Sequence, residues 1–274
     1  MRPLKPASRV QLLLLVLGLE SAVALTLFSA DVREWARTVA VPARNAPSPR
    51  LVVPPAPLPE PYTVITRYPF ETEASLRPWE EKVFRGKSAY RVVGEPGATY
   101  LESSSRGSSS GLFLKMDTKA SPELFLDWRW RAKKFPVKRR EKLADRSQDD
   151  FAARVYVVFA GTNFFNTRVI EYIWDEKLPL ETVSSSPFSG NVKLFVVASG
   201  LAPGDGWRRE ERNIRDDYKK LFGSEPQKSV AAIALMSDSD NTGTESAADF
   251  GDFVIKIRKT KETAPPAAPD HTEE

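Results

Sequence analysis

Residues 124–131 read LFLDWRWR, and this stretch decides the fold class. Leu124, Leu126, Trp128 and Trp130 alternate with one aromatic and three charged residues. Successive side chains of a β-strand point to opposite faces of a sheet. An apolar period of two therefore predicts a half-buried strand.

The same kind of signal recurs along the chain. Residues 192–198 and 230–236 are nearly continuous apolar runs, which is typical of strands covered on both faces. Further strands are predicted at 154–159, 168–174 and 253–258, with weaker ones at 98–102 and 111–116 around a Ser/Gly turn at 103–110.

One helix interrupts the strands. Asn213 is a suitable N-cap, Gly223 a suitable end, and Ile214, Tyr218 and Leu221 fall on one helical face. Many strands with one helix predict an all-β fold, a jelly-roll-like antiparallel β-sandwich with one short helix.

The first thirty residues have the features of an export signal. A basic start precedes an apolar run at residues 12–19, and Ala22-Val23-Ala24 matches a signal-peptidase site with cleavage after Ala24. The alternative for residues 1–30 is an uncleaved anchor, which is long enough to span a bilayer but contains Glu20. In either case we predict a periplasmic protein, released or tethered to the inner membrane.

Residues 31–61 are predicted to be a linker, because eight prolines fall between positions 42 and 61. The β-sandwich domain is then placed at 62–258 and a disordered tail at 259–274. The chain has no cysteine, and its one histidine, His271, lies in this tail. These facts exclude disulfides and thiolate nucleophiles and argue against a Ser-His-Asp triad or a zinc site.

Basic residues are concentrated at one place. Residues 129–142 contain eight Lys/Arg and one Glu, a local charge of +7 in a chain of net charge +4. Such a segment is either a solvated loop or a docking site for anionic lipid, polysaccharide or nucleic acid. Because export separates the chain from nucleic acid, we expect no nucleic-acid partner.

Charged residues inside apolar strands indicate a possible ligand site. Arg154 and Glu171 are expensive to bury unless they are paired, so they form either a structural ion pair or the polar floor of a groove. Aromatic rings beside carboxylates are a common way to bind sugars. The predicted ligand-binding set is Arg154, Tyr156, Glu171, Tyr172, Trp174 and Trp207.

A second candidate site lies between two predicted strands. Asp238, Asp240 and Asn241 cluster oxygen ligands, and Asp249 or Asp252 would complete a calcium shell. The predicted metal set is therefore Asp238, Asp240, Asn241 and Asp252, with calcium as the possible cofactor. The alternative is a polar hairpin turn, since Asn, Asp, Thr and Gly are ordinary turn residues.

Several ordered motifs carry a resemblance to a known family. They are LDWRW at 126–130, DDFAARVYVVF at 149–159, IEYIW at 170–174, the residues from Ser199 to Gly223 around Trp207, ALMSDSDNTG at 234–243 and FGD at 250–252. The chain resembles the bacterial family catalogued as domain of unknown function 3047, roughly from Tyr62 to Arg258. It departs from the family pattern at Ser237, Ser239 and Phe250. The resemblance implies an exported protein with no established activity.

These observations predict a noncatalytic exported β-sandwich that binds a glycan or another cell-envelope component. The membrane is a further partner if the N-terminal segment is uncleaved. One alternative is a carbohydrate-active enzyme that uses a carboxylate pair among Glu171, Glu210, Glu211 and Asp217. Another is a structural subunit of an envelope complex.

Overall fold

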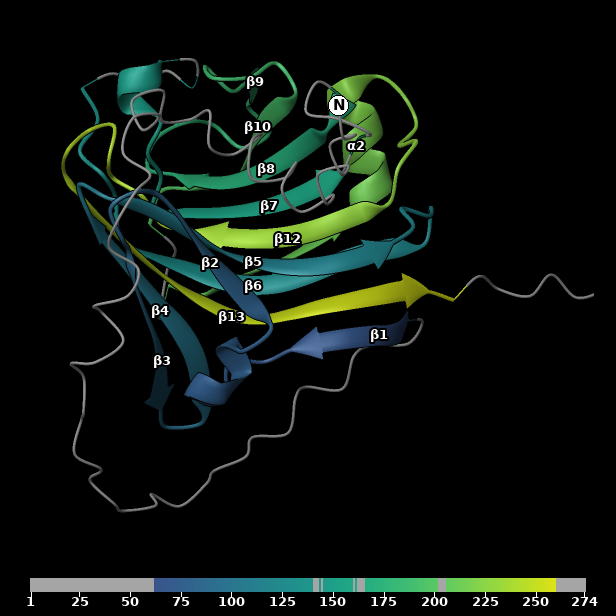
Figure 1. Cartoon of the computed structure of the whole chain (residues 1–274), viewed down its shortest axis with the longest axis horizontal. Coiled ribbons are helices and arrows are strands. Elements are labelled where there is room, and N and C mark those ends of the chain that lie inside the picture. The colour runs from purple at the N-terminus through teal and green to yellow at the C-terminus, as the bar shows by residue number, and fades with distance from the viewer. Residues whose placement is uncertain are drawn as a thin grey trace, which may run out of the picture.

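The computed structural model describes residues 62–139, 143, 145–159, 161, 166–201 and 206–259. In this part of the chain, thirteen strands and one α-helix form two facing sheets with the helix at one end (Figure 1). The predicted signal or anchor at 1–30, the linker at 31–61 and the tail after Lys259 lie outside the described residues.

The first sheet has six strands, which are β1 (Tyr62–Tyr68), β3 (Ala89–Glu95), β4 (Ala98–Arg106), β6 (Leu124–Lys134), β11 (Arg208–Asn213) and β13 (Glu245–Arg258). Their order is β11-β6-β13-β4-β3, and β1 also pairs with β13. The long strand β13 pairs with β6 along one edge, and with β4 and then β1 along the other.

The second sheet has seven strands, which are β2 (Trp79–Arg85), β5 (Ser109–Thr118), β7 (Ala153–Phe159), β8 (Arg168–Asp175), β9 (Val183–Ser185), β10 (Val192–Ser199) and β12 (Val230–Met236). Their order is β2-β5-β12-β7-β8-β10-β9. Strands β8 and β10 run parallel, and the other pairs are antiparallel. The predicted all-β sandwich is confirmed, with this one parallel pair added.

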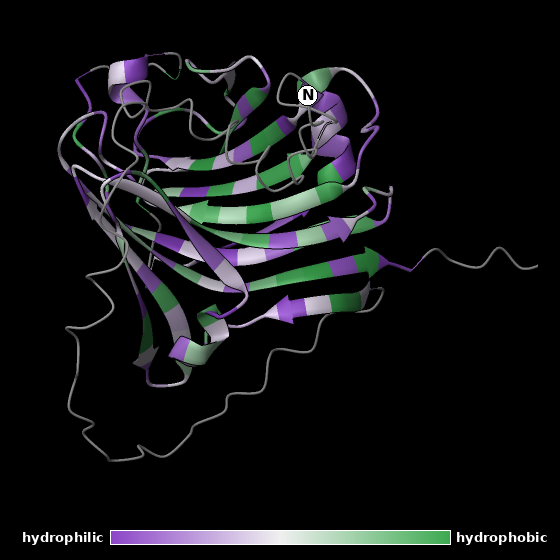
Figure 2. Ribbon diagram, in the orientation of Figure 1, coloured by the Kyte–Doolittle hydropathy of each residue, from purple (hydrophilic) through white to green (hydrophobic). Residues whose placement is uncertain are grey.

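Aromatic side chains from the two sheets meet in the core. Trp128 of β6 lies 5.3 Å from Tyr172 of β8 between ring centres, and Trp130 lies 5.6 Å from Trp174. All four rings are fully buried. The apolar run predicted for β12 is buried on both faces of its sheet, and Figure 2 shows this strand as hydrophobic along its length.

All eight predicted strands are present, but five strands give no clear sequence signal: β1, β2, β3, β9 and β11. Strand β11 reads RREERN and contains no apolar residue. It forms because it pairs with the edge of β6, where Arg209 makes two hydrogen bonds to Asp127 at 2.8 and 2.6 Å. Tertiary pairing therefore outweighs its poor strand propensity.

The predicted helix is confirmed as α2 (Ile214–Phe222). The Asn213 side chain accepts the backbone N–H of Asp216 at 3.0 Å, and Gly223 ends the helix with φ of 68°. The helix buries Ile214, Tyr218 and Leu221, the predicted face.

The predicted Ser/Gly turn at 103–110 is wrong in its extent. Strands β4 and β5 continue through most of it, and only Gly107 and Ser108 lie between them. The physical reason is that the hydroxyls of four of these serines, Ser105, Ser108, Ser109 and Ser110, have hydrogen-bond partners inside the protein. Ser105 Oγ lies 2.7 Å from Ser239 Oγ and 2.8 Å from Ser246 Oγ, so these polar residues are buried without an unmet hydrogen bond.

Candidate functional site

The structure separates the predicted ligand-binding residues Arg154, Tyr156, Glu171, Tyr172, Trp174 and Trp207. Arg154, Tyr156 and Glu171 lie on the outer face of the second sheet. Tyr172 and Trp174 point into the core, because neighbouring residues of a strand alternate between the two faces. These five are at most 1% exposed. Trp207 lies beside the first sheet, against Tyr100. The expectation of one shared open groove is therefore corrected.

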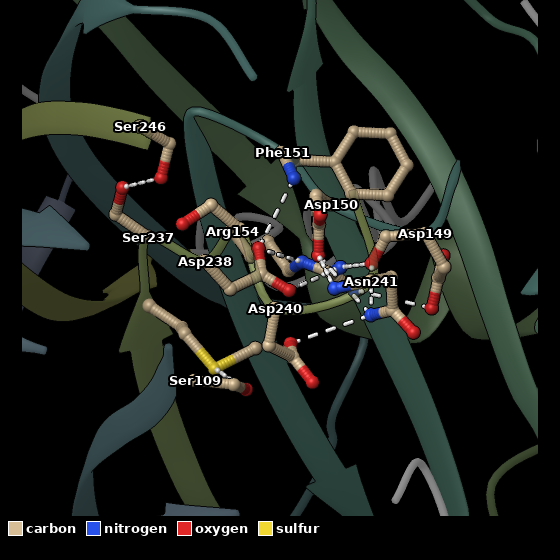
Figure 3. A network of polar contacts seen from close by, with 12 residues as sticks. Ser109, Asp149, Asp150, Phe151, Arg154, Ser237, Asp238, Asp240, Asn241 and Ser246 are labelled. Atoms are coloured by element: carbon tan, nitrogen blue, oxygen red, sulfur yellow. Dashed lines mark hydrogen bonds and ion pairs between the residues drawn. The ribbon is translucent and has the colours of Figure 1, made fainter. Parts of the chain in front are cut away.

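Arg154 and Glu171 form the structural ion pair that the sequence left open as an alternative. Arg154 Nη1 donates to Glu171 Oε1 at 2.5 Å. Its Nε and Nη2 donate to the two carboxylate oxygens of Asp238 at 2.9 and 2.6 Å (Figure 3). All three side chains are buried. Arg154 thus joins β7, β8 and the turn that follows β12.

Three carboxylates gather beside this arginine. Asp150, Asp238 and Asp240, here called the acidic cluster, each place one carboxylate oxygen within 4.8 Å of the others. Asp150 accepts the backbone N–H of Thr242 at 2.6 Å and of Asn241 at 3.1 Å. Two of the predicted cation ligands, Asp238 and Asp240, are therefore brought together with Asn241 next to them.

The fourth predicted cation ligand is elsewhere. Asp252 is hydrogen-bonded to Arg67, and Asp249 pairs with Arg131 at 2.5 Å, both on the first sheet. The reason is geometric: both residues lie well inside β13, away from the turn that carries Asp238 and Asp240. The third carboxylate of the cluster is therefore Asp150, and not Asp252 as predicted from the sequence.

Negative charge is in excess around Arg154. Asp149, Asp150, Glu171, Asp238 and Asp240 are all buried, and Arg154 is the fully buried cation among them. Burial raises the pKa of Asp149, Asp238 and Asp240, and it raises the pKa of Glu171 to about 7, with Arg154 opposing each shift. Such a cluster can be neutralised by protonation, which the raised pKa values favour, or by a bound hard cation.

A pocket of about 430 Å³ opens next to the acidic cluster, and it is lined by Val137, Arg139, Asp145, Ser147, Gln148, Asn241 and Thr242. Asn241 connects the two features. Its amide nitrogen lies 3.1 Å from Asp150 Oδ1 and 3.3 Å from Asp240 Oδ1 (Figure 3). One lining residue of the pocket, Asn241, therefore contacts two of the three carboxylates, which do not themselves line it.

A different group of side chains surrounds Trp207 on the outer face of the first sheet. The guanidinium carbons of Arg129 and Arg131 lie 4.8 and 4.9 Å from the Trp207 ring centre, and Tyr100 packs edge-on at 5.5 Å. Arg131 also donates to Asp249 at 2.5 Å. These residues, Tyr100, Arg129, Arg131, Trp207 and Asp249, are here called the Trp207 site.

The Trp207 site combines a partly exposed ring with buried charge. Trp207 and Arg129 are partly exposed, whereas Asp249 is fully buried. Burial raises the pKa of Asp249, and the hydrogen bond from Arg131 opposes this rise. Asp249 Oδ1 has no hydrogen-bond partner among the described residues. Such an acceptor is costly to bury without a hydrogen-bond partner.

Gly251 on the neighbouring strand makes room for Arg129. A Cβ atom at this position would come 2.2 Å from Arg129 Cγ and 2.4 Å from its Nε. Arg129 therefore lies directly across β13 to reach Trp207. This is a close approach that only glycine allows.

The carboxylates proposed as catalytic pairs are dispersed and partnered. Glu171 binds Arg154, Asp217 makes two hydrogen bonds with Arg212, and Glu211 binds Lys256. Glu210 accepts the indole N–H of Trp130 at 3.3 Å, and burial raises its pKa to about 7. Three of these four carboxylates are therefore held by cations, and the fourth, Glu210, by an indole N–H.

Sequence reasoning missed Asp150, and it did not connect Arg129, Arg131 and Asp249 with Trp207. The available signal for the arginines was the period-two pattern, which places both on the face of β6 opposite to the tryptophans. The basic segment 129–142 is also less of a loop than expected, because its first six residues belong to β6. Residues 140–142 lie outside the described part.

In the described ranges, no helix has the length and apolarity needed to cross a membrane. Residues 1–30, where the anchor is predicted, are not among them.

Several solved structures resemble this chain at low sequence identity and low TM-score. The family 11 carbohydrate-binding module of a cellulosomal cellulase from Clostridium thermocellum is 9% identical, with 73% of this chain and 99% of that chain covered and a TM-score of 0.37. The xylan-binding domain from Paenibacillus barcinonensis is 11% identical, with 73% and 97% covered and a TM-score of 0.36. The xyloglucanase domain of NopAA from Sinorhizobium fredii is 9% identical, with 66% and 93% covered and a TM-score of 0.39.

These values are too low to transfer a ligand or a reaction, and the structures include both binding modules and an enzyme. No curated protein matches the chain in sequence. The model of the family described as "Protein of unknown function (DUF3047)" matches residues 77–254, which is most of the chain and contains both candidate sites. The chain therefore belongs to the DUF3047 family.

Proposed function

We propose that the protein is an exported, noncatalytic β-sandwich that binds a glycan of the cell envelope at the Trp207 site. The observation that carries the proposal is the partly exposed Trp207 ring with the guanidinium groups of Arg129 and Arg131 within 4.9 Å of its centre. The likeness to carbohydrate-binding modules is consistent with this function but does not carry it.

The chemistry of the Trp207 site suits a sugar. A pyranose ring presents an apolar face of C–H groups, which packs on an aromatic ring, and an edge of hydroxyls, which bond to charged side chains. Tryptophan combines a large apolar surface with a polar edge, and hydrogen bonds to charged groups are roughly twice as strong as those between neutral groups. Arg129, which is partly exposed, supplies such a group next to the ring, and the buried pair of Arg131 and Asp249 lies beside it.

Binding is tested with the full chain on a broad panel of envelope polysaccharides and oligosaccharides. The Trp207→Ala variant should lose at least about tenfold in affinity for any glycan retained, since a buried aromatic contact is worth more than about 1.4 kcal/mol at binding hot spots. Arg91→Ala is the matched control, because Arg91 lies in the same sheet in an exposed pair with Glu102. Retention of no glycan at all, or equal binding by Trp207→Ala, would refute the proposal.

We further propose that the acidic cluster holds calcium. The buried carboxylates outnumber the buried cations around Arg154, and the 430 Å³ pocket gives access to Asn241. Asp150 and Asp240 are the main candidate ligands, since Asp238 is already bound through both oxygens to Arg154. In this role calcium would stabilise the turn between β12 and β13 without taking part in a reaction.

Thermal unfolding in chelator and in millimolar calcium tests this site. A ligand at a hundredfold excess over its Kd stabilises the folded state by about 2.7 kcal/mol. At roughly 2–4 °C per kcal/mol, Tm should rise by several degrees. Asp240→Asn should remove the calcium dependence and leave the fold intact, whereas Asp252→Asn, away from the cluster, should retain it. An identical Tm of the wild type in both buffers would refute the calcium site and leave the turn between β12 and β13 with a purely structural role.

Export is the remaining part of the proposal and rests on the N-terminal sequence. Cell fractionation should find the protein outside the cytoplasm. Intact-mass analysis should then give either a chain that begins at Leu25 or the full chain in the membrane fraction. A full-length chain in the cytoplasmic fraction would contradict export.

A further inference from the structure

A second pocket, of about 300 Å³, lies where the β4–β5 turn meets the first residues of β13 and the end of β6. Its lining is polar and contains four serines, two of them Ser105 and Ser246. It is here called the serine pocket. Its residues are separate from both the acidic cluster and the Trp207 site.

Two of the lining serines, Ser105 and Ser246, belong to a chain of hydroxyl groups that continues to Ser237 behind the pocket. Ser105 Oγ lies 2.8 Å from Ser246 Oγ, and Ser246 Oγ lies 2.7 Å from Ser237 Oγ (Figure 3). Each hydroxyl has one rotatable donor and two acceptor sites. The chain can therefore turn a donor toward an anionic oxygen in the pocket at the expense of one internal bond.

The rim of the serine pocket is positively charged. Lys87, Arg106 and Lys134 line it, and one carboxylate, Glu245, lies between the last two. The side chains of Lys87, Arg106 and Lys134 are 66%, 86% and 54% exposed. Exposed ion pairs of this kind are weak. Arg106 and Lys134 can therefore exchange Glu245 for another anion, and Lys87 can exchange its partner Glu81.

We propose that the serine pocket binds the anionic group of an acidic sugar, a carboxylate or a phosphate. This proposal rests on the proposed function only in taking the ligand to be a glycan, and it deepens that function by assigning the glycan to the acidic class. The cations supply charge-assisted hydrogen bonds, and the serine hydroxyls supply neutral donors. Glu245 competes with the ligand for Arg106 and Lys134.

Because Glu245 competes with the ligand, removal of its charge should strengthen the binding of an anionic sugar. NMR titrations of the full chain would compare D-glucuronate, D-glucose 6-phosphate and neutral D-glucose. We expect both charged sugars to bind more tightly than glucose. The double variant Arg106→Ala/Lys134→Ala should weaken the binding of charged sugars by about tenfold, and Glu245→Gln should strengthen it by about threefold, as expected for one partly screened charge at a surface.

Arg91→Ala is again the control, since it removes an exposed arginine of the same sheet that does not line the pocket. Tm of each variant reports whether the fold is kept. Preference for glucuronate alone or glucose 6-phosphate alone supports the proposal and identifies the acidic group.

Equal affinity for all three sugars, or weaker binding of the charged sugars by Glu245→Gln with an unchanged Tm, overturns the proposal. Failure of the Trp207 site is distinguishable. In that case Trp207→Ala leaves glycan retention unchanged, while the serine-pocket variants still alter the binding of the charged monosaccharides.

Discussion

Replacement of Arg154 by methionine tests the electrostatic design of the second sheet. Arg154 is fully buried and lies 2.5 Å from Glu171, 2.6 Å from Asp238 and 3.7 Å from Asp149. Methionine keeps much of the length of the side chain but removes the charge. The variant leaves three buried carboxylates without their shared cation.

The expected cost follows from this arrangement. Removal of one partner of a buried ion pair destabilises by about 3–5 kcal/mol. For a domain of nearly 200 residues, 1 kcal/mol corresponds to roughly 2–4 °C, so Tm should fall by about 6–20 °C. Differential scanning calorimetry of the full chain at pH 7.5 in chelator measures the shift.

A compensating variant separates charge from packing. Arg154→Met combined with Glu171→Gln and Asp238→Asn removes two of the stranded charges, so it should recover part of the lost stability. A Tm for Arg154→Met within 2 °C of the wild type (about 1 kcal/mol or less) would refute the reasoning. So would a triple variant less stable than the single one.

Three further predictions concern pH, the Trp207 site and the domain boundary. Because burial raises the pKa of Glu171 to about 7 in the folded state from an ordinary 4.5, the folded protein binds more protons than the unfolded one between these values. In chelator, Tm should therefore fall as pH rises from about 5 to 7.5, and Glu171→Gln should flatten this slope; a wild-type Tm that rises over this range would contradict the assignment. Gly251→Ala places a Cβ against Arg129 and should weaken glycan binding, whereas Gly94→Ala, with nothing within 4 Å, should leave both affinity and Tm unchanged. Residues 62–258 expressed alone should be soluble and melt at the same temperature as the full chain, because both sheets are built from this range; aggregation of the truncated chain would show that the N-terminal region has a structural role.

Much of the fold can be predicted from the sequence because its central strands carry strong local signals. The alternation in β6, the apolar runs in β10 and β12, and the Asn213 and Gly223 ends of α2 all identify their elements correctly. Strands such as β11 cannot be found in this way. Its polar residues become a strand only because β6 supplies a hydrogen-bonding edge and Asp127 supplies a partner for Arg209.

The candidate sites are less accessible to sequence reasoning. Arg154 and Glu171 can be paired from their positions in neighbouring strands, and Asp238 with Asp240 from their spacing. However, Asp150 is 88 residues before Asp238, and Arg131 is 118 residues before Asp249. Such contacts depend on the order and register of the strands, which a single sequence does not specify.

The glycan-binding claim is tested most directly by the indole N–H signals of the protein during titration with a glycan that it retains. The chain has six tryptophans, and the signal of Trp207 is assigned from its loss in Trp207→Phe. We predict that the Trp207 signal shifts saturably, while those of the buried Trp128, Trp130 and Trp174 stay in place. Saturable binding with an unchanged Trp207 signal would contradict the account and place the ligand elsewhere on the sandwich.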